Sequence, residues 1–412
     1  MNIFQSLLMY LVWFLSTYFV VLFMLLVLKY RKSIFESKQT KLMRLPMVSI
    51  VIPAYNEEKS IKDTITSLKT LDYPKKKLEI IIINDGSKDR TAERINFLKN
   101  ELDFTFINNT VNLGKAYCLN LGIKKSKGEF VVCMDADTRV KHDVIKKTLE
   151  HFDAEDVAAV TVGIDVNPQN FLQRITQIEY AIGISLSLAI LSRLNTAHVT
   201  PGPFTIFRKS ALEKIGGFDE KNITEDMEIA YRLHKSQYKI KCCLSSKVYT
   251  DVPKDLKTLY RQRKRWYTGA LQTIVKHKDV LFNTELGIFG FFIPYTFSLI
   301  LLGVLLFVFS TLLSIYNSLK NLSFYRLTGF NFLSHIEFNL DPLSIFSVYS
   351  LLILFSFSMT ILMTFIGLRV LNKKIRKSFS GFFGFAYLFI LYQVFWISSI
   401  YSFVFKRRIQ WK

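Results

Sequence analysis

Residues 48–58 read VSIVIPAYNEE and residues 130–138 read FVVCMDADT. In each stretch a short run that is free of charge and rich in β-branched residues is followed at once by polar and acidic side chains. Short apolar runs of this kind are typical of strands buried on both faces of a sheet. Both stretches therefore predict a buried strand that ends in acidic residues.

Strand and helix patterns alternate between these two stretches. We predict strands over residues 80–83 and 104–107, and helices over residues 57–71, 89–102 and 115–125. This alternation predicts an α/β domain with a mostly parallel sheet that is covered by helices on both faces. In such a sheet the ligand lies beyond the carboxyl ends of the strands.

Long stretches without charge flank this region. Residues 4–28, 286–319, 343–368 and 378–405 contain no Lys, Arg, Asp, Glu or His. Each exceeds the roughly 20 residues with which a helix crosses about 30 Å of hydrocarbon. We interpret the first as a permanent anchor, because it lacks the basic n-region and cleavage site of a signal peptide. The sequence therefore excludes a soluble cytoplasmic enzyme, a disordered chain and a secreted disulfide scaffold.

The basic residues predict the orientation of these helices. None precedes the first charge-free stretch, and six follow it: Lys29, Arg31, Lys32, Lys38, Lys41 and Arg44. Because basic residues accumulate on the cytoplasmic side, we expect a multi-pass protein of the cell membrane whose large central region is cytoplasmic. Alternating spans then place Lys373, Lys374, Arg376 and Lys377 inside. They place the tail with Lys406, Arg407, Arg408 and Lys412 outside, which the same rule disfavours.

These patterns divide the chain into four parts. We predict a transmembrane helix with a basic linker over residues 1–45, a cytoplasmic domain over 46–250, an interfacial helix region over 251–285 and three transmembrane helices over 286–412. The interfacial part includes the basic and aromatic segment from 256 to 277, for which a solvated basic helix is the alternative. The charge-free run 180–192 is too short to span and predicts a second interfacial helix. The four cysteines are expected to be reduced packing thiols.

Acidic residues follow three of the predicted strands. Glu57 and Glu58 follow the first strand, Asp85 follows the second, and Asp135 and Asp137 follow the strand at 130–134. Two carboxylates one residue apart at a buried strand end repel each other, which favours a hard divalent cation as their partner. Asp135 and Asp137 are therefore candidate ligands of Mg²⁺ or Mn²⁺, which would complete its shell with diphosphate oxygens. Asp-rich turns that only shape the backbone are the alternative for each cluster.

These residues, with several others in the same order, resemble the processive family 2 glycosyltransferases. The motifs are Pro53-Ala54-Tyr55-Asn56-Glu57, Asn84-Asp85-Gly86-Ser87, Asn112-Leu113-Gly114-Lys115-Ala116, Asp135-Ala136-Asp137, Thr224-Glu225-Asp226 and Gln262-Arg263-Lys264-Arg265-Trp266. The resemblance covers residues 46–275. It looks closest to the poly-β-1,6-N-acetylglucosamine synthases, with the cellulose, chitin and hyaluronan synthases as relatives.

The resemblance implies a role for each matching residue. Asp85 would lie near the uracil and Lys115 near the nucleotide, with Asp135 and Asp137 at the diphosphate and its metal. Asp226 would be the general base of an inverting displacement, an assignment that suits a carboxylate taking a proton from the acceptor hydroxyl. A purely structural helix cap at Thr224-Glu225-Asp226 is the alternative.

The Gln262, Arg265 and Trp266 set is expected to bind diphosphate and acceptor. Gln262 and Trp266 are four residues apart and share a helical face, with Arg265 beside them. A guanidinium can grip diphosphate with paired hydrogen bonds, and an indole can stack on a sugar. Anchoring of the helix at the lipid headgroups by Trp266 is the alternative.

We therefore expect a membrane-embedded, metal-dependent, processive β-glycosyltransferase that transfers sugar, preferentially N-acetylglucosamine, from a UDP-sugar to a growing extracellular polysaccharide. The expected partners are the UDP-sugar donor, a glycan or lipid acceptor, membrane lipids and an accessory membrane subunit, with no nucleic acid. The alternatives are a non-processive enzyme that glycosylates a membrane lipid, a cellulose- or hyaluronan-type synthase that uses another UDP-sugar, and an inactive polymer-binding partner.

Overall fold

The computed structural model describes residues 3–35, 44–327, 348–373 and 375–406 of the 412-residue chain. The chain forms two compact units. The smaller comprises residues 1–28 and 295–363, and the larger comprises residues 29–294 and 364–412. All the candidate site residues named above belong to the larger unit.

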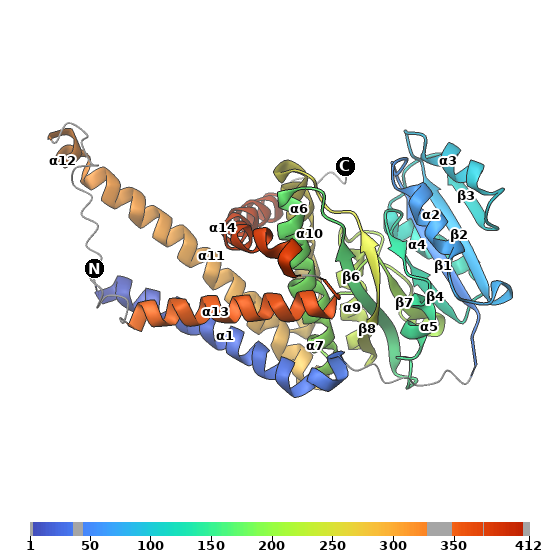
Figure 1. Ribbon diagram of the computed structural model, residues 1–412, viewed down its shortest axis with the longest axis horizontal. Coiled ribbons are helices and arrows are strands. Elements are labelled where there is room, and N and C mark those ends of the chain that lie inside the picture. The colour runs from blue at the N-terminus through green and yellow to red at the C-terminus, as the bar shows by residue number, and fades with distance from the viewer. Residues whose placement is uncertain (1–2, 36–43, 328–347, 374, 407–412) are drawn as a thin grey trace. The chain divides into compact units, whose positions relative to one another are not determined.

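The larger unit contains one eight-stranded sheet in the order β3-β2-β1-β4-β7-β6-β8-β5 (Figure 1). Its strands are β1 Val48–Ala54, β2 Leu78–Asp85, β3 Thr105–Asn109, β4 Phe130–Cys133, β5 Arg139–Val140, β6 Val157–Val166, β7 Thr205–Arg208 and β8 Lys239–Thr250. Parallel pairing joins β1 to β2 and β4, β2 to β3, and β6 to β8. Antiparallel pairing joins β7 to β4 and β6, and β5 to β8. The predicted α/β class with a mostly parallel sheet is confirmed.

Two apolar cores lie on the two faces of this sheet. Successive β1 residues alternate between them, because side chains along a strand point to opposite faces. Ile50 and Ile52 pack in one core with Ile61 and Ile65 of α2. Val51 packs in the other core, with residues of the helices that cover the opposite face. All seven residues of β1 are buried, as its uninterrupted apolar run predicts.

Helices of the larger unit cover both faces of the sheet. They are α2 Ile61–Lys69, α3 Thr91–Leu98, α4 Lys115–Lys125, α5 Val144–Leu149, α6 Phe171–Glu179, α7 Ser187–Arg193, α8 Lys209–Lys214, α9 Glu225–Lys235 and α10 Leu256–Lys276. Single turns occur at η1 Lys75–Lys77, η3 Lys278–Val280 and η4 Thr284–Leu286, and a π-helix η2 Tyr180–Leu186 joins α6 to α7. All four cysteines are free and buried, as predicted.

Helices also form over the four charge-free stretches. They are α1 Ile3–Phe35, α11 Ile288–Lys320, α13 Val348–Val370 and α14 Ile375–Val404, with the short α12 Leu322–Leu327 after α11. The start of the third predicted span, residues 343–347, lies outside the described residues, as do Lys38, Lys41, Lys374, Arg407, Arg408 and Lys412. The number and orientation of spans stay predictions.

Three stretches of described residues are long and apolar enough to cross a membrane: Phe171–Arg193, Ile288–Lys320 and Ser350–Val370. The first contains the run that we predicted to be an interfacial helix. It packs on the sheet, since η2 contacts β6 and α7 contacts β8. The Ser185 hydroxyl also bonds the backbone N–H and carbonyl of Ile164 in β6, at 3.0 and 3.1 Å. This stretch is therefore tied to the sheet.

Candidate active site

The carboxyl end of β2 and the start of α4 are joined through Asp85. The Asp85 side chain is buried, and its two oxygens accept backbone N–H groups of Leu113 at 2.9 Å and Gly114 at 2.8 Å. Gly114 has φ +98°, a left-handed conformation that glycine adopts without strain. Asp85 thus fixes the turn that leads into α4 and places Lys115 at the first position of that helix.

Lys115 connects two parts of the site that are far apart in the sequence. Its ammonium lies 2.6 Å from Oδ1 of Asp135, which follows β4, and 2.9 Å from Oε1 of Glu225 in the first turn of α9. Burial disfavours the charged form of Lys115, but Asp135, Glu225 and Asp226 outweigh it and raise its pKa. We call Lys115, Asp135 and Glu225 the ionic cluster.

Asp137 lies on the turn after β4, like Asp135, and several other carboxylates are close to it. Burial raises its pKa to about 7, and Asp135, Glu57 and Asp251 add to the shift, while Lys115 opposes it. Its hydrogen bonds from Thr138 and Thr250 are long, at 3.5 and 3.3 Å. Among the described residues, no ion pair joins this carboxylate to a positive side chain that would stabilise its charged form.

Asp226 lies beside the ionic cluster, in the first turn of α9. Burial and the adjacent Glu225 raise its pKa to about 6, against the influence of Lys115 and Arg265. The Asp226 carbonyl accepts two hydrogen bonds from Thr200, from its N–H at 3.0 Å and its hydroxyl at 2.9 Å. The base candidate is therefore held at the start of a rigid helix and is more basic than an exposed aspartate.

The turn after Thr200 approaches the ionic cluster closely. A Cβ atom at Gly202 would lie 2.6 Å from Nζ of Lys115 and 2.8 Å from Oδ2 of Asp135. Any larger residue would displace one of these charged groups. The Pro201-Gly202-Pro203 turn therefore lies against Lys115 and Asp135.

The Gln262, Arg265 and Trp266 set lies on α10, as its spacing predicts. Arg265 is close enough to Asp226 to lower its pKa. The half-buried Trp266 ring packs against the core on one face of the sheet, with the Tyr180 ring 6.5 Å away. In the part of the chain that the structure describes, no hydrogen bond or ion pair joins Gln262 or Trp266 to the ionic cluster.

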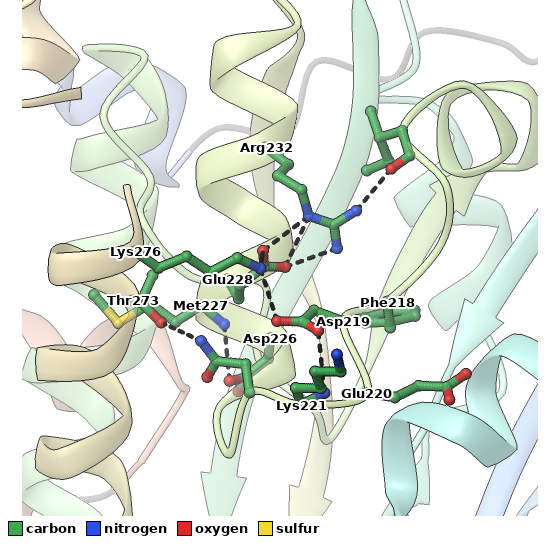
Figure 2. A network of polar contacts seen from close by, with 12 residues as sticks. Phe218, Asp219, Glu220, Lys221, Asp226, Met227, Glu228, Arg232, Thr273 and Lys276 are labelled. Atoms are coloured by element: carbon green, nitrogen blue, oxygen red, sulfur yellow. Dashed lines mark hydrogen bonds and ion pairs between the residues drawn. The ribbon is translucent and has the colours of Figure 1, made fainter. Parts of the chain in front are cut away.

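A second charged network fixes α9 against the end of α10 (Figure 2). Glu228 is fully buried and accepts from Arg232, from Lys276 at 2.6 Å and from His277 at 3.0 Å. Burial alone would raise its pKa, but hydrogen bonds from these three residues lower it to about 2. Asp219, from the loop before α9, also pairs with Lys276 at 2.7 Å. The network thus sets the position of the helix that carries Asp226.

Two buried charged residues of this region were not singled out from the sequence. Glu225 was noticed only as part of a motif, yet it is the second partner of Lys115. Arg263 lies inside the Gln262–Trp266 motif but is 1% exposed and pairs with Glu179 of α6. In the sequence, Glu179 and Arg263 are each a charged residue on an amphipathic segment. This pattern does not predict that the two segments are in contact.

The donor atoms at the end of β4 fit a hard divalent cation. Asp135 and Asp137 offer carboxylate oxygens, the ligands that Mg²⁺ and Mn²⁺ prefer. Burial is the main cause of the raised pKa of Asp137, and Asp135, Glu57 and Asp251 add negative charge that a cation would neutralise. Among the described residues, no group of three or more His, Cys, Asp or Glu side chains is placed to hold a metal. The protein would therefore supply few ligands, as Mg²⁺ sites that complete their shell with substrate phosphates require.

Comparisons with known proteins identify a family and several relatives. The family model described as glycosyl transferase family 2 matches residues 49–216. The chain is 39% identical over 234 residues to the poly-β-1,6-N-acetyl-D-glucosamine synthase of Staphylococcus epidermidis, a match covering 56% of each chain. It is 36% identical over 283 residues to the protein of that name from Staphylococcus aureus, covering 67% of each. The alignment with the S. epidermidis relative thus spans little more than half of its length.

The fold also matches a solved structure. The mannosyltransferase PcManGT from Pyrobaculum calidifontis, determined in complex with GDP-Man and Mn²⁺, superposes with a TM-score of 0.53. The match covers 85% of this chain and 99% of that protein, at 17% identity. At this identity the likeness concerns the fold, in agreement with the α/β class that the strand pattern predicted.

Proposed function

This chain belongs to glycosyl transferase family 2, and we propose that it is a membrane-embedded, processive β-glycosyltransferase that transfers N-acetylglucosamine from a UDP donor to a growing extracellular polysaccharide. The observation that carries the proposal is Asp226, a half-buried carboxylate with a raised pKa next to the ionic cluster. The preference for N-acetylglucosamine rests on the names of the two staphylococcal relatives.

Asp226 acts as the general base of an inverting displacement. A general base is most effective when its pKa lies near the working pH, because it is then both deprotonated and strongly basic. A pKa of about 6 leaves Asp226 mostly ionised at neutral pH. It takes the proton of the acceptor hydroxyl, and that oxygen attacks the anomeric carbon from the side opposite the departing diphosphate.

The donor diphosphate binds between α4 and β4. Lys115 supplies a positive charge at this position, and the backbone N–H groups at the start of α4 add the partial positive charge of a helix N-terminus. Asp85 keeps the turn before α4 in place through Leu113 and Gly114. Asp135 and Asp137 would hold the divalent cation. When bound, the cation would neutralise the diphosphate and make it a better leaving group.

The acceptor binds on the α10 side of the site. Arg265 lies near enough to Asp226 to contact a diphosphate or an acceptor hydroxyl positioned there. Trp266 contributes an aromatic surface on which a sugar ring can stack. The Pro201-Gly202-Pro203 turn leaves no room for a side chain beside Lys115 and Asp135, so it defines one wall of the space above the cluster.

A donor panel tests this proposal. Membranes that contain the protein are supplied with individual radiolabelled UDP-sugars, and the product is sized before and after digestion by glycosidases of known linkage specificity. We expect label from UDP-N-acetylglucosamine in a long polymer that a β-1,6-N-acetylglucosaminidase degrades. A short lipid-linked product would show a non-processive enzyme, and polymer from another UDP-sugar would show a different synthase.

A further inference from the structure

Arg263 is the largest fully buried side chain among the described residues, and it is 1% exposed. It occupies the second position of the Gln262–Trp266 motif, whose residues Gln262, Arg265 and Trp266 we expect to contact substrate. A guanidinium this deeply buried cannot reach a substrate without leaving its partners. Its effect on the reaction must therefore pass through the side chains that it touches.

Arg263 joins three helices that are far apart in the sequence. Its Nη2 donates to Oε2 of Glu179 on α6 at 2.7 Å, and its Nε donates to the Tyr392 hydroxyl on α14 at 3.3 Å. The Tyr392 hydroxyl in turn donates to the same Glu179 oxygen at 2.6 Å. In Figure 1, α6, α10 and α14 lie side by side, in agreement with their contacts. Arg263 is thus one of the residues that fix α10 to α14.

The same guanidinium contacts both flanking residues of the motif. Its Nη1 donates to Oε1 of Gln262 at 2.8 Å. Its central carbon lies over the Trp266 ring, 4.0 Å from the centroid. A cation over an aromatic face is attracted to the ring, and a guanidinium fixed by an ion pair holds that ring in one orientation. One face of the Trp266 ring is therefore covered by the guanidinium.

We propose that Arg263 is a positioning residue, which holds Gln262 and Trp266 in the orientation needed for turnover and is itself held by Glu179 and Tyr392. The role in turnover rests on the proposed function, but the role in orientation does not. A buried ion pair contributes little net stability, because desolvation of both charges offsets their attraction. A gain in stability therefore does not explain an arginine at this position. Its contacts with Gln262 and Trp266, which we expect to face the substrate, do explain it.

A double variant that removes both charges of the ion pair distinguishes a positioning role of Arg263 from a role in folding. Arg263→Met alone would leave Glu179 buried without its partner, and such variants are often unstable. In Arg263→Met/Glu179→Gln both charges are removed together, and the amide carbonyl of the introduced glutamine can still accept from Tyr392. The matched control is Lys247→Met/Asp165→Asn, which removes both charges of another buried pair, 2.8 Å apart, between β8 and β6. Lys373, which lies 3.0 Å from the same Asp165 oxygen and is partly exposed, keeps its charge in this control.

Two readouts are measured on the full-length protein in detergent. The first is the ¹⁹F spectrum after incorporation of 5-fluorotryptophan, where the Trp266 signal among the four tryptophans is assigned by its loss in Trp266→Phe. The second is kcat and KM for UDP-N-acetylglucosamine. We expect the Arg263→Met/Glu179→Gln variant to shift and broaden the Trp266 signal and to lower kcat at least about tenfold, with KM for the donor within about twofold. The control should leave the Trp266 signal unchanged.

A Trp266 signal identical to wild type in the double variant would overturn the proposal, as would a kcat within about twofold of wild type. If the wild-type protein transfers no sugar from any donor, the proposed function fails. The ¹⁹F spectra then still decide whether Arg263 orients Trp266.

Discussion

The pKa of Asp226 has a direct kinetic consequence. Burial and Glu225 raise it to about 6, and a general base works only when deprotonated. We therefore expect kcat/KM to fall about tenfold per pH unit below pH 6 and to level off above it. Initial rates between about pH 4.5 and 8, at fixed metal concentration, measure this decrease of kcat/KM at low pH. A profile that stays flat from about pH 5 to 7 would exclude a base with this pKa.

The acidic turn after β4 predicts a dependence on divalent metal. Burial raises the pKa of Asp137 most, nearby negative charges raise it further, and a cation would relieve their repulsion. We expect excess chelator to abolish transfer, Mg²⁺ or Mn²⁺ to restore it, and Asp137→Asn to lower the rate by about 10²-fold or more, since metal stabilisation of a leaving diphosphate is worth several kcal/mol.

The control for this prediction is Asp72→Asn. Asp72 is an exposed carboxylate that pairs with Lys146 at 2.7 Å on the surface. Its substitution should change neither the rate nor the metal requirement, because exposed ion pairs contribute little. Full activity of the wild-type protein in excess chelator would rule out the metal role of Asp135 and Asp137.

The sequence predicted single site residues better than their partners. Asp85, Lys115, Asp135 and Asp226 were identified by their motifs, and the structure brings them into one connected region through Gly114 and Glu225. That Glu225 would pair with Lys115 could not be predicted, because the contact depends on how α9 packs beside α4. The roles assigned to these residues stay predictions.

At the scale of elements, the contact between α9 and α10 decides how Asp226 lies relative to the Gln262–Trp266 motif. A Cβ atom at Gly269 of α10 would lie 2.3 Å from Cγ2 of Thr224, the residue before α9. We expect Gly269→Ala to destabilise the protein by about 1–3 kcal/mol, as overpacking does, and to lower transfer by separating the two helices. Thermal unfolding in detergent and initial rates measure both effects.

Two further variants make this prediction specific. Thr224→Gly removes the clashing atoms, so adding it to Gly269→Ala should recover part of the lost stability. Gly183→Ala is the matched control, because a Cβ there meets nothing within 4 Å. Equal stability of Gly269→Ala and Gly183→Ala would show that the two helices are not in close contact.

Some helices and strands were predicted from the sequence and others were not. The strands that precede the acidic motifs lie within a few residues of their predicted ends, and α4 begins and ends where predicted, at Lys115 and Lys125. The second half of the sheet was not predicted. β7 is only four residues long and β8 carries several polar residues, so neither has the continuous apolar pattern that identified β1 and β2.

At the scale of the whole molecule, the predicted orientation in the membrane can be tested by cysteine labelling. The four native cysteines are buried and should react slowly, so single cysteines can be introduced into the wild-type background. Lys76 in η1 and Asn321 after α11 are both exposed in the structure. The positive-inside rule predicts that Asn321→Cys reacts with a membrane-impermeant maleimide in intact cells.

Lys76→Cys should react only after the membrane is permeabilised, because the sheet-bearing unit is expected in the cytoplasm. Labelling of Lys76→Cys in intact cells would place this unit outside. It would also exclude a UDP-sugar from the cytoplasm as the donor.

Polymer formation by purified wild-type protein and Asp226→Asn, supplied with radiolabelled UDP-N-acetylglucosamine, tests the catalytic centre most directly. Asparagine keeps the size of the side chain but cannot accept the proton of the acceptor hydroxyl. We expect the variant to fold, to bind UDP with affinity within about twofold of wild type, and to lose at least about 10²-fold in rate. Asp72→Asn, at the exposed ion pair with Lys146, should retain the wild-type rate. Polymer made by Asp226→Asn at the wild-type rate would contradict the assignment of Asp226 as the general base.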